Sequence, residues 1–364
     1  MRVLIVSSLK RRIAPDEFAS RSRIIYEVAH GLVERGHDVS VLGTGDSIVE
    51  GATIIPVIPK GWTSLPPVEN DFIRDIAFLT MQAKHIVALQ ENFDVVHNHT
   101  YPDFFPHIVD TQLKIPLLST LHALYDDYMD ETLSLFHNSS FVALSHAYTQ
   151  LYKKTKFAGV VYNGVDTKTY AYKEEKGDYL FWLGRLPKAK NADGTFMDPK
   201  GVRHAIALAQ KTGSNLMLGG VVEDPAFFEQ DVKPHLNEQI QWVGDVSPKQ
   251  SLSTEKVVSL MQDAKVFLMT INQEEPFGLV MAEAMSCGTP VIGFDRGSVR
   301  EVVAEGETGF VVAPEKDIDG LAEALAKIES IKAFDCRKRV EDHFSIAKMV
   351  EGYEALYTEL IQKK

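Results

Sequence analysis

The chain has 364 residues, of which 45% are apolar and 24% charged, and its net charge is −12. This length predicts two domains of ordinary size, and the composition is that of a globular protein. No stretch reaches the 18 apolar residues that a membrane span needs. The acidic balance disfavours a general nucleic-acid binder, which needs a basic face. Residues 1–170 are closer to neutral than the rest, which leaves only a peripheral membrane contact open for them.

The cysteine count and the first residues indicate a cellular compartment. Cys287 and Cys336 are too few for a disulfide framework. Residues 1–10 contain a short apolar run followed by basic residues, without the cleavage site of a signal peptide. We therefore expect a cytoplasmic protein with incidental thiols.

Short apolar runs rich in β-branched residues alternate with longer stretches of helical period in the first half of the chain. This alternation is typical of βαβ units around a parallel sheet. The predicted strands are 3–6, 38–42, 53–55, 94–97, 116–121, 141–144 and 160–162, and the helices between them include 23–35, 73–89 and 147–154.

A second series with the same alternation begins at residue 179. It predicts a second parallel sheet with its own helices. The predicted strands are 179–183, 215–218, 240–243, 266–269, 290–292 and 309–312, and the helices include 202–211, 226–236, 277–287 and 321–328.

The polar segment 163–178 separates the two series, so we expect it to be the linker and hinge. The predicted fold is α/β, with two Rossmann-like, doubly wound domains over residues 1–165 and 166–345. The C-terminal segment 346–364, helical over 346–362, would pack back on the first domain. Ligands of such sheets bind beyond the carboxyl ends of the strands, and two facing domains would share one cleft.

The most informative segment runs from Glu274 to Pro290. Pro276 suits the first position of a helix and Gly288 the residue after its last turn, so the segment predicts a helix over 277–287. This helix would start at the carboxyl edge of the second sheet, where unpaired N–H groups favour a phosphate. Those groups would belong to Phe277, Gly278, Leu279 and Val280.

Two carboxylates of this segment suggest a long ligand. Glu275 and Glu283 are eight residues apart, which corresponds to roughly 12 Å along a helix axis. Carboxylate pairs of glycosidases lie closer, at about 5 to 9.5 Å, so a hydrolytic pair is disfavoured. The spacing suits carboxylates that bind hydroxyls on either side of a diphosphate. The alternative for Glu283 is a solvated helix residue.

This segment resembles the Glu-x7-Glu signature of retaining glycosyltransferases of the GT-B fold, family 4, also called glycosyl transferases group 1. Other segments resemble the same family in order along most of the chain. They are VVHNH at 95–99, TLH at 120–122, NGVD at 163–166, YLFWLGR at 179–185, Lys200-Gly201, WVGDV at 242–246, FDRGSVREVV at 294–303 and EGETGFVV at 305–312. The resemblance implies an acceptor-binding first domain, a second domain that binds a nucleotide-sugar donor, and no metal requirement.

The resemblance also implies which cations bind the diphosphate. Arg185 and Lys200 would offset the charge that develops as the nucleoside diphosphate leaves. An apparent insertion at 187–199 lengthens the gap between them, so Lys188 or Lys190 is an alternative phosphate ligand. The alternative is that Arg185 and Lys200 are ordinary surface cations without a role in ligand binding.

Sugar and base contacts follow from the same resemblance. Glu275 would orient hydroxyls of the donor sugar, and Glu283 would bind the ribose. Backbone groups near Gly244 and Val246 would bind the base, with UDP the expected carrier. His122 would face the sugar diphosphate and hydrogen-bond a sugar hydroxyl, its alternative being a satisfied core histidine.

Two features of the first domain stand apart from these roles. The first loop, 11–22, lacks the glycine pair usual in the family, so Ser20 or Arg21 is the candidate replacement. His97 and His99 point to one face of a strand, which suits either a metal pair or, more often, core or cleft histidines. No nearby carboxylate or cysteine completes a metal set by spacing, and we expect no metal.

The sequence therefore predicts a retaining hexosyltransferase-type enzyme that moves a sugar from a nucleotide donor, a UDP-sugar, to a hydroxyl of a sugar, metabolite or lipid. No side chain stands out as a general base, so the leaving phosphate would take the acceptor proton. Two alternatives are a non-catalytic sugar-nucleotide binding protein and a Rossmann-type NAD-dependent enzyme. The absence of a glycine fingerprint after Val6 disfavours the latter.

Overall fold

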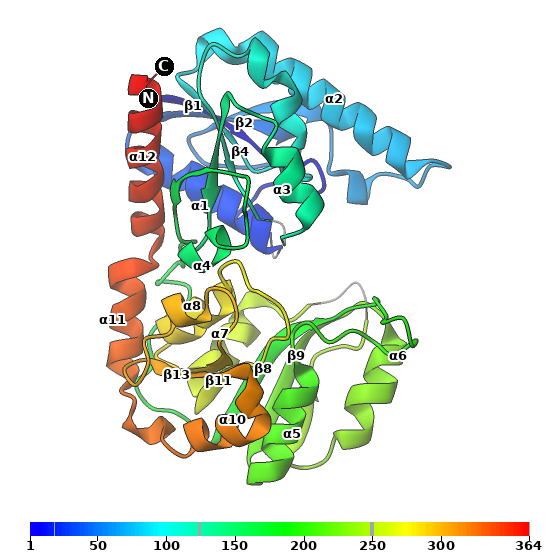
Figure 1. Ribbon diagram of the computed structural model, residues 1–364, viewed down its shortest axis with the longest axis vertical. Helices are drawn as coiled ribbons and strands as arrows, with labels where there is room; N and C mark the ends of the chain where they lie inside the picture. Colours follow the sequence, from blue (N-terminus) through cyan, green and yellow to red (C-terminus); the bar gives the residue numbers. More distant parts are fainter. Residues whose placement is uncertain (18, 123–124, 248–250, 364) are drawn as a thin grey trace. The chain divides into compact units, whose positions relative to one another are not determined.

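The computed structural model describes residues 1–17, 19–122, 125–247 and 251–363. The chain divides into two compact units, one formed by Met1–Gly164 with Ile346–Lys364 and the other by Val165–Ser345. Each unit is a parallel sheet with helices packed on it (Figure 1). The α/β architecture with two parallel sheets is thus confirmed.

Within its described residues, the first unit contains seven strands in the order β3-β2-β1-β4-β5-β6-β7. All the pairings are parallel. The order reverses between β1 and β4, and the carboxyl ends of strands at such a switch point commonly form a ligand site. The strands are β1 Arg2–Val6, β2 Asp38–Thr44, β3 Thr53–Ile58, β4 Val95–Asn98, β5 Leu117–Thr120, β6 Ser139–Ala143 and β7 Phe157–Val160.

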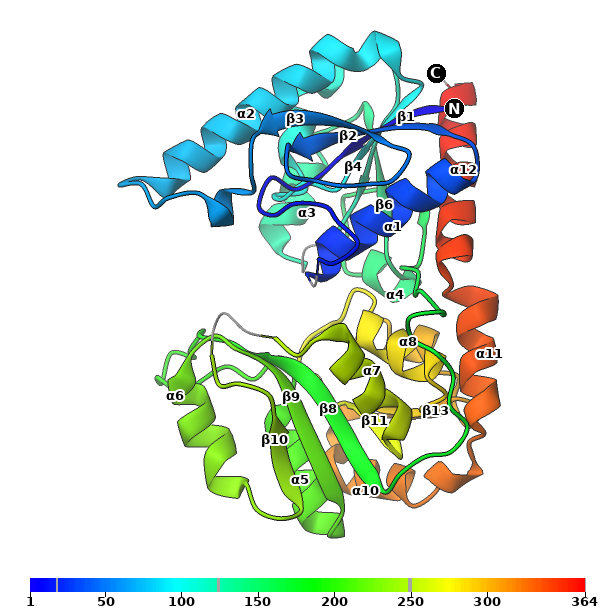
Figure 2. The same cartoon turned by 180° about the vertical axis from the view of Figure 1, so that it is seen from behind.

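Helices cover both faces of this sheet because successive strand residues point to opposite sides. Leu4 and Val6 pack in one buried cluster with Ile86 of α2. Helices α1 and α12 lie side by side (Figures 1 and 2), and a Cβ on Gly31 would come within 2.6 Å of Val350. The helical segments are α1 Ser20–Glu34, η1 Trp62–Ser64, α2 Asp71–Leu89, η2 Gln90–Asn92, η3 Phe105–Gln112, α3 Asp127–Leu133, α4 His146–Thr149 and α12 Ile346–Lys363.

The described part of the second unit contains six strands in the order β10-β9-β8-β11-β12-β13, again with parallel pairing. Its switch point lies between β8 and β11, so the segments that follow these two strands are the expected ligand edge. The strands are β8 Tyr179–Leu186, β9 Asn215–Val222, β10 Ile240–Val243, β11 Val266–Met269, β12 Val291–Phe294 and β13 Gly309–Val312.

The core of the second unit lies on both faces of its sheet. Trp182 and Phe196 are fully buried on one face with α5 and α10. Phe181 and Phe267 have their rings 5.9 Å apart and are fully buried too. The helical segments are α5 Val202–Thr212, α6 Pro225–Phe227, η4 Phe228–Val232, η5 Lys233–His235, α7 Thr254–Asp263, α8 Leu279–Ser286, α9 Val299–Val302, η6 Pro314–Lys316, α10 Asp317–Leu325, η7 Ile328–Ser330 and α11 Ala333–His343.

Several predicted boundaries are wrong. The helix expected over 226–236 is divided into α6, a π-helical turn and a 3-10 turn, and Pro234 lacks the backbone N–H that one continuous α-helix would require. The helix expected over 147–154 ends at Thr149. The strand expected over 160–162 is β7, Phe157–Val160. Helices α3, α7 and α11 were not among the predicted helices, although Val257, Leu260 and Met261 of α7 are buried at helical spacing.

None of the helices in the described ranges combines the length and the apolar character that a bilayer crossing requires.

Candidate active site

The predicted donor-binding residues of the second unit lie along the carboxyl edge of its sheet. Arg185 is close to the end of β8, Gly244 directly follows β10, and Glu275 lies in the loop after β11. Since β10, β9, β8 and β11 are consecutive in the sheet, neighbouring strand spacings of about 4.8 Å place β10 and β11 roughly 14 Å apart. This edge is long enough for an extended ligand.

Lys200 and Glu275 form the central ion pair of this edge. Lys200 Nζ donates to Glu275 Oε2 at 2.6 Å. The side chain of Lys200 is 26% exposed and that of Glu275 14%, so both are mostly shielded yet accessible to a ligand. A charge-assisted bond in such a setting is stronger than one between neutral groups.

Backbone contacts hold the loops that carry this pair together. Thr270 Oγ1 donates to the Gly201 carbonyl at 2.7 Å, and the amide of Asn272 donates to the Pro199 carbonyl at 2.9 Å. Gly201 has a φ of 71°, and a Cβ there would lie 1.6 Å from the Thr270 carbonyl oxygen. Only glycine permits this approach, which brings Lys200 to Glu275.

The backbone of Glu275 is fixed by the segment after β12. The amide of Ser298 donates to the Glu275 carbonyl at 3.0 Å, and Ser298 Oγ donates to the Phe277 carbonyl at 2.8 Å. Gly297 approaches the same backbone so closely that a Cβ would lie 2.4 Å from the Glu275 nitrogen. The FDRGSVREVV segment therefore fixes the backbone of Glu275, and its Arg296 pairs with the neighbouring Glu274 at 3.8 Å.

Helix α8 begins two residues later than expected. It spans Leu279–Ser286, and Gly278 before it is left-handed, with a φ of 70°. Glu275 thus precedes the helix, so the separation of roughly 12 Å along a helix axis is wrong as a description of Glu275 and Glu283. Phe277 is buried in the loop, and the first helical N–H groups are those of Leu279 and Val280.

Two helix N-termini at this edge differ in their capping. The carboxylate of Asp198 accepts bonds from the amides of Val202 and Arg203, both at 3.0 Å, and so occupies the start of α5. Helix α8 has no side-chain cap at Gly278. The N-terminus of α8 is therefore the one whose dipole and amides remain available to an anion.

Arg185 is placed on the same edge but does not join the Lys200–Glu275 pair. Its NH1 donates to Glu223 Oε1 at 3.0 Å, and its side chain is 56% exposed. An exposed pair of this kind contributes little to stability, so the guanidinium is free to exchange Glu223 for a phosphate at small cost. The backbone N–H of Lys188 also contacts Glu223, at 3.4 Å.

The insertion forms a small hairpin anchored by one aromatic side chain. Lys190 and Phe196 form an antiparallel bridge, and the ring of Phe196 stacks on Phe227 with centroids 5.1 Å apart. Lys190 Nζ lies 4.4 Å from the Phe196 ring centroid. Of the three candidate lysines, Lys200 is the one that contacts Glu275, whereas Lys190 is engaged by an aromatic face.

The residues expected to bind base and ribose differ in burial. Gly244 has a φ of 102°, and Val246 is 36% exposed, so the segment after β10 offers its backbone to solvent. Glu283 lies inside α8 and is only 3% exposed, which contradicts the alternative of a solvated helix residue.

His122 lies at the end of β5 in the first unit. Its backbone N–H donates to Asp103 Oδ2 at 3.0 Å, and Asp103 Oδ1 pairs with Arg21 NH1 at 2.8 Å. Arg21 also donates to the Thr100 carbonyl at 2.8 Å. Arg21, expected in the first loop as a glycine replacement, lies instead in the first turn of α1, where it supports the backbone around His122 through Asp103.

His97 and His99 are fully buried, with ring centroids 3.9 Å apart. His99 Nδ1 lies 2.9 Å from His122 Nε2, and His97 Nε2 lies 2.8 Å from Thr120 Oγ1. Their ring nitrogens are used by hydrogen bonds within the unit. Across the described ranges, no group of three or more His, Cys, Asp or Glu side chains is arranged to hold a metal ion.

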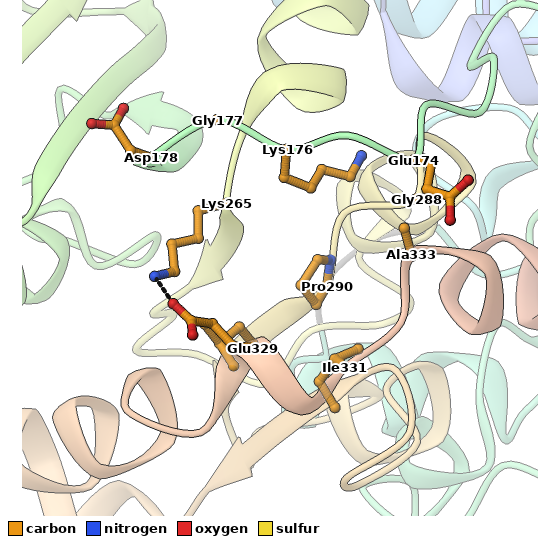
Figure 3. A pocket seen from close by; sticks show the side chains of 11 residues that line it. Glu174, Lys176, Gly177, Asp178, Lys265, Gly288, Pro290, Glu329, Ile331 and Ala333 are labelled. Atoms are coloured by element: carbon orange, nitrogen blue, oxygen red, sulfur yellow. Dashed lines mark hydrogen bonds and ion pairs between the residues drawn. The ribbon is translucent and has the colours of Figure 1, made fainter.

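A cavity of about 290 Å³ lies elsewhere in the second unit, at the amino ends of β8, β11 and β12 (Figure 3). Lys265 pairs there with Glu329 at 2.9 Å. Burial lowers the pKa of Lys176 to about 8, and its Nζ donates to the Cys287 carbonyl at 2.8 Å. None of the predicted site residues lines this cavity, which occupies the opposite edge from Glu275.

Sequence reasoning missed the residues that position the charged pair. Thr270, Asn272 and Ser298 act through loop backbone, and no motif marks such contacts. Asp198 had a usable signal, because an acidic residue shortly before a predicted helix start is a common cap. Glu223, the partner of Arg185, comes directly after β9 and carried no signal of its own.

Two family models together match most of the chain. Residues 168–342 match the family model described as Glycosyl transferases group 1, and residues 22–169 match the model described as Glycosyltransferase Family 4. The chain is 24% identical to N-acetyl-alpha-D-glucosaminyl L-malate synthase of Bacillus anthracis, over 92% of this chain and 93% of that protein.

Two solved structures are similar to the whole chain. Sucrose-phosphate synthase from Thermosynechococcus elongatus has a TM-score of 0.76 and 18% identity, with 100% of both chains covered. Anabaena Alr3699/HepE, solved in complex with UDP and glucose, has a TM-score of 0.68 and 16% identity, with 99% of this chain and 100% of that chain covered. These likenesses show a shared fold.

Proposed function

Because this chain belongs to the group 1 (family 4) glycosyltransferases of the GT-B fold, we propose that it transfers a sugar from a UDP-sugar to an acceptor hydroxyl with retention at the anomeric carbon. The second unit would bind the donor and the first unit the acceptor. The acceptor hydroxyl would belong to a sugar, a small metabolite or a lipid. We also propose a cytoplasmic location, which suits the two free, buried cysteines.

The observation that carries this proposal is the Lys200–Glu275 pair at 2.6 Å, next to the uncapped start of α8. A cation, a carboxylate and free amides at one sheet edge match the needs of a sugar diphosphate. Lys200 and the amides of Leu279 and Val280 would bind the diphosphate, with Arg185 as a second cation. Glu275 would accept hydrogen bonds from hydroxyls of the transferred sugar.

The chemistry follows from these charges. As the bond between the anomeric carbon and the phosphate oxygen breaks, negative charge develops on the diphosphate, and Lys200 with the α8 N-terminus stabilises it. The acceptor oxygen forms its bond to the same face of the anomeric carbon. Its proton passes to the leaving phosphate oxygen, so no protein base is required. The protein supplies orientation and electrostatics.

The choice of UDP rests on two supports. The structural neighbour from Anabaena was solved with UDP and glucose. In this chain, the exposed backbone near Gly244 and Val246 lies at the β10 end of the edge, at the far side from Glu275. A base bound there and a sugar bound by Glu275 would span the edge, with the diphosphate between them near β8 and β11.

Calorimetric titration with UDP, ADP, GDP and NAD tests the donor assignment. We expect UDP to bind and Lys200→Met to weaken that binding, while Lys188→Met serves as the matched control. Binding of NAD without any nucleoside diphosphate would support the dehydrogenase alternative. Binding of UDP and UDP-sugars without turnover in any acceptor mixture would support a sugar-nucleotide binding protein instead.

A further inference from the structure

A chain of hydrogen-bonded side chains links His122 to the C-terminal helix α12 inside the first unit. His122 Nε2 lies 2.9 Å from His99 Nδ1, and His99 Nε2 lies 3.2 Å from His97 Nδ1. His97 Nδ1 lies 2.6 Å from the hydroxyl of Tyr357. On its other side, His97 Nε2 lies 2.8 Å from Thr120 Oγ1.

The branch through Thr120 ends on the same helix. Thr120 Oγ1 lies 2.9 Å from the hydroxyl of Tyr353, and both tyrosines are fully buried. We refer to His122, His99, His97, Thr120, Tyr353 and Tyr357 as the histidine relay. All of its members belong to the first unit.

The three histidines of the relay are neutral at ordinary pH. Burial lowers the pKa of His99 to about 3 and holds the pKa of His97 and of His122 well below 6.5. The positive charge of Arg21 lowers the pKa of His99 and His122 further. A neutral imidazole carries one N–H and one acceptor nitrogen, so each ring is either the Nδ1–H or the Nε2–H tautomer.

Tyr357 determines in which direction the hydrogen bonds of the histidine relay are donated. Within the described residues, its buried hydroxyl has one hydrogen-bond partner, His97 Nδ1. A buried O–H that donates to nothing is costly, so the phenol donates and His97 Nδ1 accepts. The single proton of His97 then lies on Nε2, where it is donated to Thr120 Oγ1.

This choice propagates to His122. Because His97 Nδ1 is an acceptor, the contact at 3.2 Å requires a proton on His99 Nε2. His99 Nδ1 is then the acceptor of the contact at 2.9 Å, which requires a proton on His122 Nε2. His122 Nδ1 is left with a lone pair, and within the described residues it has no hydrogen-bond partner.

The opposite direction satisfies fewer contacts. A proton on His97 Nδ1 would have to serve both Tyr357 and His99, and the hydroxyl hydrogen of Tyr357 would be left unused in the core. In the favoured arrangement, the six members of the relay carry one polar hydrogen each, and five of these hydrogens form the five hydrogen bonds of the relay. The sixth belongs to Thr120 or Tyr353. The two tyrosines therefore differ: Tyr357 sets the direction and Tyr353 does not.

We propose that His97, His99 and Tyr357 are positioning residues that fix His122 in the Nε2–H tautomer and present its Nδ1 as a hydrogen-bond acceptor. The ligand group that meets Nδ1 must then be a donor. With the donor-sugar role of His122, which rests on the proposed function, that group is a sugar hydroxyl. A carboxylate or carbonyl oxygen at the same place would be rejected.

Long-range ¹H–¹⁵N NMR of ¹⁵N-histidine-labelled full-length protein tests the tautomer without any ligand. The signal of His122 is assigned by its loss in H122N. We expect the Nε2–H pattern in the wild type and in Tyr353→Phe, and a mixture of both tautomers in Tyr357→Phe. A wild-type Nδ1–H pattern, or the same pattern in both tyrosine variants, would overturn the proposal.

Binding provides the second readout. For Tyr357→Phe we expect the affinity for UDP-glucose to fall about five- to tenfold, as for one lost hydrogen bond, with the affinity for UDP unchanged. Tyr353→Phe is the matched control on the same helix, and we expect neither affinity to change. An equal loss of both affinities in Tyr357→Phe would indicate a merely structural role and contradict the proposal. If UDP does not bind the wild type, the proposed function fails while the NMR result still tests the relay.

Discussion

Lys200 Nζ lies 2.6 Å from Glu275 Oε2 although 75 residues separate the two in the chain. The pair forms because β8 and β11 are neighbours in the sheet and because the loops after them share backbone hydrogen bonds. Each of the two side chains is the hydrogen-bond and charge partner of the other. A sugar diphosphate would insert its phosphate oxygens next to the cation and its hydroxyls next to the carboxylate.

Replacing Lys200 with Met should weaken UDP binding by roughly 10- to 100-fold, the value of a charged hydrogen bond. The methionine keeps the volume of the side chain but removes the charge that the diphosphate requires. Calorimetry of UDP binding measures the effect. Lys188→Met is the matched control, since Lys188 lies in the same segment without contacting Glu275, and its affinity should stay at the wild-type value. Equal losses of UDP affinity in the two variants would contradict the assignment of phosphate binding to Lys200 and would implicate the hairpin.

Replacing Glu275 with Gln should lower sugar transfer by roughly 100-fold or more, since an oriented charged group near the reacting centre typically contributes this much. UDP itself should bind at least as well as before, because Lys200 is retained and loses a competing partner. Initial rates with a UDP-sugar and calorimetry with UDP separate the two effects. Glu307→Gln, an exposed carboxylate of the same unit, should leave both unchanged. Unaltered transfer by Glu275→Gln would remove Glu275 from the mechanism.

Replacing Gly201 with Ala should disrupt the site through the backbone. The φ of 71° and the 1.6 Å approach to the Thr270 carbonyl oxygen leave no room for a Cβ, so the two loops must separate. Gly194→Ala is the control, because its φ is 85° but nothing lies within 4 Å. It should cost only the left-handed strain of about 1 kcal/mol. The temperature of thermal unfolding and the affinity for UDP should both fall much further for Gly201→Ala than for Gly194→Ala. Similar unfolding temperatures and affinities in the two variants would show that the close approach is unimportant.

Much of the second unit was predictable from sequence because its strands are short apolar runs bounded by glycine, proline or polar residues. Glycine and proline around Glu275 predicted a helix correctly but misplaced its start, since Gly278 adopts a left-handed conformation that a motif does not reveal. The pairing of Lys200 with Glu275 depends on sheet order, which periodicity alone does not determine.

The first unit was harder to predict at its functional edge. His97 and His99 were visible as residues on one face of a strand, yet their partners Tyr353 and Tyr357 lie on the last helix of the chain. Contacts over such a separation depend on tertiary packing of α12 beside α1. Sequence could therefore suggest buried histidines but not the relay that they form.

The buried histidines should make the first unit sensitive to acid. Burial lowers the pKa of His99 and of His107 to about 3, whereas the unfolded chain binds protons near pH 6.5. The free energy of unfolding should therefore be highest above pH 6.5 and fall as the pH decreases toward 3, by about 1.4 kcal/mol per pH unit for each such histidine.

Hydrogen exchange of peptides from β4 and β5, corrected for the intrinsic pH dependence of exchange, measures this slope within the first unit. His107→Gln retains a side chain that can bond Ser119 and Ser139 but does not titrate. In this variant, the change in the free energy of unfolding per pH unit should be smaller by the contribution of one histidine, about 1.4 kcal/mol. A slope that does not change, or stability that rises in acid, would contradict the assignment of neutral buried rings.

Retaining transfer from a UDP-sugar is tested most directly by an NMR time course in D₂O with α-linked UDP-glucose, UDP-galactose and UDP-N-acetylglucosamine, each without acceptor. Water then replaces the acceptor hydroxyl, and the anomeric proton of the released sugar reports the stereochemistry. We predict that one of these donors yields UDP and the α-anomer at equal initial rates, and that Glu275→Gln lowers both rates by roughly 100-fold or more. Release of the β-anomer first, or intact donors in the presence of a wild-type protein that binds UDP, would contradict the account.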